Sequence, residues 1–139
     1  MKRSKATFGV LGVFLAVVAV SAQTSQVATP ASSPVARGEY LTTRVAMCVQ
    51  CHSPRDEKGE ILESQRFSGA PIPFTSPFGS SWAARAPNIR SLRGFTDEQA
   101  FMLLTEGHAG ARPAPQRPMP PFRMSPDDAR AIIAFLRTQ

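Results

Sequence analysis

The apolar positions in the first part of the chain predict a helix that leads into a cysteine pair. Ser33 and Pro34 form a typical helix start, because a hydroxyl can cap the first turn and proline at the first helical position loses no hydrogen bond. Leu41 and Val45 lie four residues apart, and Cys48 follows three residues later. This spacing predicts one helical face that runs into Cys48.

A second helix is predicted near residue 96. Thr96 and Gln99 have the spacing of a capping box, and Phe101 and Leu104 would lie on the buried face. Gly107 would end the helix, since glycine readily adopts the left-handed conformation of a C-terminal cap.

A third helix is predicted at the end of the chain, where Ser125 and Pro126 repeat the start signal of Ser33 and Pro34. The patterns thus indicate three helices along the chain. The predicted buried face of the third helix consists of Ile132, Ile133, Phe135 and Leu136.

The segments between the predicted helices, residues 53–94 and 107–121, are rich in proline, and the first is also rich in glycine. Neither segment has the pattern of a long strand or helix. Long irregular segments are uncommon in compact domains. We therefore expect a large apolar cofactor to supply part of the core. The loop side chains expected to pack against the cofactor and the helices are Ile61, Phe67, Ile72, Phe74, Phe78 and Trp82.

Residues 1–22 have the pattern of an export signal peptide. A basic start precedes an apolar run over residues 6–20, and small residues suit cleavage after Ala22. The run is shorter than the ~20 residues that cross a bilayer, so cleavage is favoured and an uncleaved membrane anchor is the alternative. Residues 23–33 predict a flexible linker. The folded domain is expected over residues 34–139, in the periplasm.

The charge of the chain gives no reason to expect a polyanion as partner. The formal net charge is +6, from 16 Lys and Arg against 10 Asp and Glu. Loss of three basic residues with the leader would leave 13 against 10, or +3, and the remaining ones are scattered along the sequence. We therefore expect no nucleic-acid binding, and membrane association only through the N-terminus.

A haem-attachment signature occurs in the sequence Cys48-Val49-Gln50-Cys51-His52. Two thiols at this spacing can reach the two vinyl groups along one side of a porphyrin, and the adjacent histidine can ligate iron. A thioredoxin-like pair would need a βαβ pattern around it, and a structural zinc site would need four Cys or His ligands, whereas only His108 follows. The motif predicts one covalent haem c, with Cys48 and Cys51 forming thioethers and His52 as axial ligand.

The second axial ligand is predicted to be Met119. This residue lies between two prolines on a segment that contributes to no helix or sheet, and a rigid loop can hold a weak thioether ligand. Met102 has the spacing of a core residue, Met124 can pack onto the following helix, and His108 follows a helix end. Met124 and His108 remain the alternative ligands.

Over residues 34–139 the chain resembles the class I c-type cytochromes. The resemblance implies a mainly α, cytochrome c-like fold, in which three or four helices and long loops wrap around one covalently bound haem. It also implies that the first and last helices cross with Gly38 against Phe135. A further implication is that the carbonyl oxygen of Pro87 accepts a hydrogen bond from the ring of His52. The matching features are Gly38 and Tyr40, Cys48-x-x-Cys51-His52, Pro87-Asn88-Ile89, the capped helix from Thr96, Met119, and Ile133-Ala134-Phe135-Leu136.

The resemblance implies outer-sphere transfer of single electrons. We therefore interpret the chain as a periplasmic monohaem electron carrier and not as an enzyme, with redox proteins as partners. A ring of docking lysines is not expected, because Lys58 is the only lysine after the leader. Two alternatives remain. A haem sensor would bind a small ligand if Met119 were absent from iron, and a membrane-associated dehydrogenase or oxidase would use the chain as its haem subunit.

Overall fold

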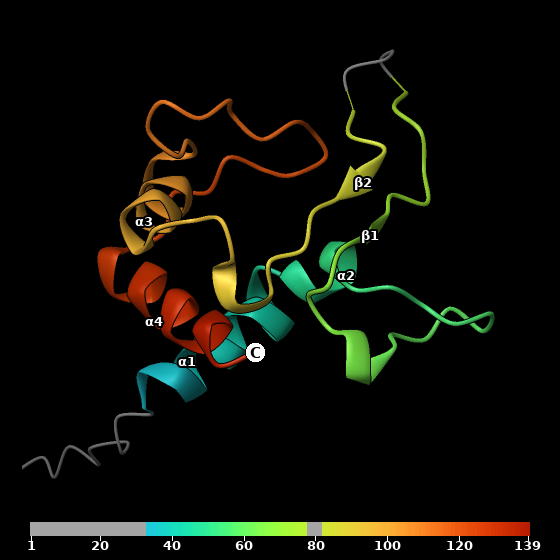
Figure 1. Ribbon diagram of the computed structural model, residues 1–139, viewed down its shortest axis with the longest axis horizontal. Helices are drawn as coiled ribbons and strands as arrows, with labels where there is room; N and C mark the ends of the chain where they lie inside the picture. Colours follow the sequence, from blue (N-terminus) through green and yellow to red (C-terminus); the bar gives the residue numbers. More distant parts are fainter. Residues whose placement is uncertain (1–32, 78–81) are drawn as a thin grey trace, which may run out of the picture.

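The computed structural model describes residues 33–77 and 82–139, and the regular secondary structure of this part of the chain is mainly α-helical (Figure 1). Three helical turns and one short strand pair connect the helices, namely a π-helix η1 (Leu41–Val45), 3₁₀ turns η2 (Glu63–Gln65) and η3 (Arg90–Leu92), and strands β1 (Ala70–Pro71) and β2 (Arg85–Ala86). The four α-helices are α1 (Pro34–Tyr40), α2 (Cys48–His52), α3 (Asp97–Glu106) and α4 (Pro126–Arg137).

The predicted signal peptide and nearly all of the predicted linker, residues 1–32, lie outside the described residues. Within the described ranges, every helix is too short or too polar to span a bilayer.

Helix α4 lies at the centre of the helical part, with α1 on one side and α3 on the other (Figure 1). Gly38 of α1 makes the closest approach. A Cβ atom at this position would lie 2.0 Å from the Ala131 carbonyl oxygen and 2.7 Å from Cβ of Phe135. The contact between Gly38 and Phe135 is therefore present, and it requires a residue without a side chain. The Arg37 guanidinium also pairs with Asp128, at 2.8 Å between Nη2 and Oδ1.

The prediction of one regular helical face leading to Cys48 is wrong. The backbone widens into the π-helix η1, where the Ala46 N–H donates to the Leu41 carbonyl oxygen at 2.8 Å. A π turn shifts the following side chains around the helix axis, so that Leu41 is buried while Val45 is 55% exposed. Met47 then adopts a left-handed conformation with φ 55°, which separates η1 from α2.

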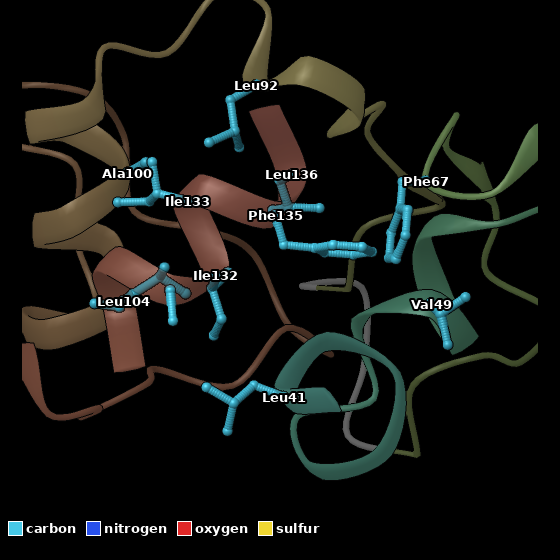
Figure 2. Packing of buried hydrophobic residues seen from close by; sticks show 12 residues of the cluster. Leu41, Val49, Phe67, Leu92, Ala100, Leu104, Ile132, Ile133, Phe135 and Leu136 are labelled. Atoms are coloured by element: carbon cyan, nitrogen blue, oxygen red, sulfur yellow. The ribbon is translucent and has the colours of Figure 1, made fainter. Parts of the chain in front are cut away.

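The core forms around the apolar face of α4, as predicted (Figure 2). The ring of Phe67, from the long loop, is fully buried and meets the ring of Phe135 edge-on, with centroids 5.8 Å apart. The α4 side chains that Figure 2 shows in this core are Ile132, Ile133, Phe135 and Leu136.

The loop aromatic residues are expected to pack against the cofactor and the helices, and Phe67 does pack against α4, whereas Phe74 is absent from this core. Phe74 is half exposed and contacts Trp82, with ring centroids 5.6 Å apart. The two rings therefore cover each other within the loop, away from the helices. Phe78 lies outside the described residues.

Helix α3 begins with the predicted capping box and ends at the predicted glycine. The Thr96 hydroxyl accepts from the Gln99 N–H, the Gln99 side chain accepts from the Thr96 N–H, and Gly107 ends the helix with φ 77°. Arg137, at the end of α4, holds the segment before this helix. Its guanidinium donates to Asp97 Oδ1 at 2.7 Å and to the carbonyl oxygens of residues 91, 92 and 95.

We expect Gly38→Ala to lower the free energy of unfolding by about 1–3 kcal/mol or more, because the added methyl group meets α4 backbone atoms that cannot rotate away. Thermal unfolding of the haem-loaded protein measures the effect. Glu39→Ala, at an exposed position on the same helix, is the control and should change stability by less than about 0.5 kcal/mol. Equal stability of the two variants would contradict the close approach of α1 and α4.

We expect Arg137→Met to lower the free energy of unfolding by about 1–3 kcal/mol, because several carbonyl groups, one of them in a partly buried hydrogen bond, lose a charged donor. Denaturant titration measures this loss. Arg130→Met removes a guanidinium from the same helix that pairs with the exposed Asp127, and its cost should stay below about 1 kcal/mol.

Candidate cofactor site

A cavity of about 410 Å³ lies between the helices, the long loop and the proline-rich segment. Its lining is mainly apolar and includes side chains that also belong to the core, such as Leu104 and Ile133. The structure brings all five residues of the predicted site to this cavity, namely Cys48, Cys51, His52, Pro87 and Met119.

Helix α2 supplies the two thiols and the imidazole from a single turn and a half of backbone. Cys48 and Cys51 are half-buried and form no disulfide, so both sulfur atoms are available for another bond. Burial raises the pKa of the Cys48 thiol to about 11. The thiol is therefore protonated and uncharged at neutral pH, which suits an apolar occupant of the cavity.

The ring of His52 is held in one orientation. His52 is 7% exposed, and its Nδ1 lies 2.7 Å from the Pro87 carbonyl oxygen. A carbonyl can only accept, so Nδ1 carries the hydrogen. Burial lowers the pKa of His52, and the hydrogen bond to Pro87 opposes this change in part. The imidazole is thus neutral near pH 7, with the lone pair on Nε2, which is the form that binds metals.

Strands β1 and β2 bring Pro87 to His52. Ala70 pairs with Ala86, and the Gly69 N–H donates to the His52 carbonyl oxygen at 2.8 Å. Gly69 has φ 86°, and a Cβ atom there would lie 2.8 Å from the Ala86 carbonyl oxygen. No motif in the sequence marks Gly69 as part of the site, although a glycine in a loop can indicate a close approach of two backbone segments.

Met119 lines the cavity from the proline-rich segment, and it is half-buried. This segment is fixed near the cavity by a hydrogen bond of 2.7 Å from the Ala83 N–H to the Arg117 carbonyl oxygen. Met47 lines the same cavity but adjoins Cys48 in the sequence. Of these two methionines, Met119 is thus the one that comes from a part of the chain far from the cysteine motif.

The two alternative ligands lie elsewhere. Met124 packs against the core cluster and does not line the cavity. The side chain of His108 is 48% exposed and lies 3.0 Å from Glu106. Met102, expected in the core, approaches Gly110 and is also absent from the cavity lining.

A second hollow, of about 420 Å³, lies beside α1 and α2 and has a different character. Its lining includes Glu39, Arg44, Glu63 and Arg66, and it contains no cysteine, histidine or methionine. The cavity beside α2 is therefore the one whose chemistry fits the sequence motif.

The donor set of the α2 cavity fits a haem. Two free thiols can form covalent bonds, one neutral imidazole can bind iron, and apolar walls can cover a porphyrin. In the described ranges, no three or more His, Cys, Asp and Glu side chains are grouped closely enough to hold a metal ion directly. A metal ion here would therefore need ligands that a macrocycle supplies.

Comparison with known proteins agrees with this geometry. The family model described as Cytochrome c matches residues 35–139. The chain is also 32% identical over 112 residues to the fructose dehydrogenase cytochrome subunit of Gluconobacter japonicus, an alignment that covers 73% of this chain and 21% of that protein. The chain thus spans about a fifth of the length of this relative. The chain belongs to the cytochrome c family, is a haem electron-transfer protein and carries one covalently bound haem c.

Proposed function

We propose that the chain is an exported monohaem electron carrier whose iron is ligated by His52 and Met119. The observation that carries the proposal is that both side chains line one apolar cavity together with the two thiols of α2. Haem bound in this cavity supplies reversible one-electron exchange at iron. The residues around it need only hold it, exclude water and keep its ligands in place.

The thiols of Cys48 and Cys51 would each form a thioether bond to the haem. They lie one helical turn apart and are free, and both line the cavity. Two covalent bonds allow a small domain to retain its cofactor without an extensive core.

His52 would bind iron through Nε2. The bond from its Nδ1 to the Pro87 carbonyl oxygen fixes the tautomer and the ring orientation. A hydrogen-bonded imidazole is also a more basic ligand. Because His52 is nearly fully buried, water has little access to the histidine side of the cavity.

Met119 would be the second residue to bind iron, through its thioether sulfur. The prolines on either side of it also line the cavity, and the adjacent Arg117 carbonyl accepts from Ala83. These constraints hold the segment without a helix or sheet. A thioether is uncharged, so it favours ferrous iron and raises the reduction potential.

A second proposal concerns the partner. The relative from Gluconobacter japonicus is named as the cytochrome subunit of a dehydrogenase. We propose that the present chain likewise accepts electrons from a dehydrogenase, either as a subunit or as a separate carrier. The catalytic reaction would then belong to the partner.

We expect Met119→Ala to leave the haem covalently attached but to lower the reduction potential, because iron loses a ligand that stabilises the ferrous form. The weak long-wavelength absorption band of the ferric sulfur–iron bond should disappear, and the ferrous protein should bind carbon monoxide. Met124→Ala and Met102→Ala are the controls and should retain the band. An unchanged spectrum in Met119→Ala would refute the ligand assignment.

We expect the mature protein to begin after Ala22, since export with cleavage at this position precedes haem attachment in the proposed function. The intact mass of the haem-loaded protein, purified from the periplasmic fraction of a host that matures c-type cytochromes, measures this. A mass that includes residues 1–22 would show that the segment is retained as an anchor.

A further inference from the structure

Two arginines line the otherwise apolar cofactor cavity. Arg85 and Arg112 are its cationic side chains, and no aspartate or glutamate of the described ranges contributes to the lining. The other titratable groups that line it are Cys48, Cys51 and His52, which have roles in the proposed haem attachment. Both arginines are also exposed to solvent, so they add positive charge to the cavity lining where it meets water, and the roles in haem attachment do not involve them.

Arg112 is held in place without an acidic partner. Its Nη1 donates to the Gly94 carbonyl oxygen at 2.5 Å, and its Cζ lies 4.2 Å from the centre of the Phe95 ring. Phe95 also lines the cavity. These contacts fix the direction of the guanidinium and leave other N–H groups free to bind an anion.

The side chain of Arg85 is exposed, and it makes no hydrogen bond or ion pair with the residues that the structure describes. It belongs to β2, where its neighbour Ala86 is buried and pairs with Ala70. The backbone of Arg85 is thereby fixed beside Pro87, whose carbonyl binds His52. An unpaired guanidinium at this rim lacks a counter-charge within the described protein.

We propose that Arg85 and Arg112 bind the two propionate groups of the haem. Haem carries two carboxylates on the edge that does not bear the thioether bonds, and burying a carboxylate is costly unless it is paired and hydrogen-bonded. The planar guanidinium forms two parallel bonds to a carboxylate. One arginine for each propionate would neutralise the charge that the cofactor brings into an apolar site.

This pairing sets the protonation of the propionates. A guanidinium beside a carboxylate lowers the carboxylate pKa, so both propionates stay ionised around neutral pH. Without the arginine, a propionate would take up a proton as the pH falls. Because loss of a negative charge near iron disfavours the ferric state, the reduction potential would then rise with falling pH.

The test uses the haem-loaded protein and its reduction potential between about pH 4 and pH 9, a range that reaches down to the ordinary pKa of a carboxyl group, about 4, and covers raised values. The variants are Arg85→Gln, Arg112→Gln and the double variant. Arg117→Gln is the matched control, because it removes the same charge next to the cavity from a side chain that does not line it. Arg85→Lys and Arg112→Lys serve where a glutamine variant is not obtained as holoprotein.

In the Gln variants, we expect the pH at which the reduction potential begins to rise to be higher than in the wild type by about 1 to 3 pH units. The redox-linked infrared bands of the propionates should then change with pH over the same range. The Lys variants should show a smaller shift, because charge is kept while the bidentate geometry is lost, and Arg117→Gln should match the wild type.

A pH profile of the Arg85 and Arg112 variants that matches the Arg117 control would overturn the proposal. So would a change confined to the salt dependence of electron exchange with a partner, since that result assigns both arginines to protein docking. The proposal rests on the haem-based function above but fails separately. If the ligand assignment is wrong, the absorption spectra give the unexpected result. If only the propionate assignment is wrong, the spectra are as expected and the pH shift of the potential is missing.

Discussion

The hydrogen bond from His52 to the Pro87 carbonyl oxygen is the contact on which the arrangement of the cavity depends. It joins the end of α2 to a segment 35 residues later in the chain, and it leaves only Nε2 of a neutral ring to face the cofactor. The bond requires β1 to pass close along β2, which a side chain at position 69 would prevent. A loop with little regular structure is thus fixed at the point where it holds the ring of His52, the proposed iron ligand.

The cavity and the core share the same walls. Leu104 of α3 and Ile133 of α4 belong to the hydrophobic core and also line the cofactor cavity. Haem in this cavity covers apolar surface that would otherwise meet water, so cofactor binding contributes directly to the stability of the helices. This explains how a domain with such long irregular segments can fold: the cofactor replaces side chains that the loop does not supply.

The structure departs from the sequence-based expectations where segments that are far apart in the chain pack against one another. The apolar spacing of Leu41 and Val45 predicted one helical face, but the close fit of Gly38 against Ala131 and Phe135 is followed by a π turn that carries Val45 to the surface. Phe74 packs on Trp82 rather than on the helices. Arg85 and Arg112 gave no signal in the sequence, because scattered arginines resemble an ordinary solvated surface until the fold brings two of them to one cavity.

The sequence by itself determined the features whose cause lies within a few residues. The helix starts at Ser33, Thr96 and Ser125 and the haem motif of α2 are of this kind, because caps and the vinyl spacing depend only on local geometry. Only the tertiary structure decided that Met119 lines the cavity while Met124 does not, and which guanidinium groups lie in the same lining. These outcomes depend on contacts between segments far apart in the chain, whose register no local pattern encodes.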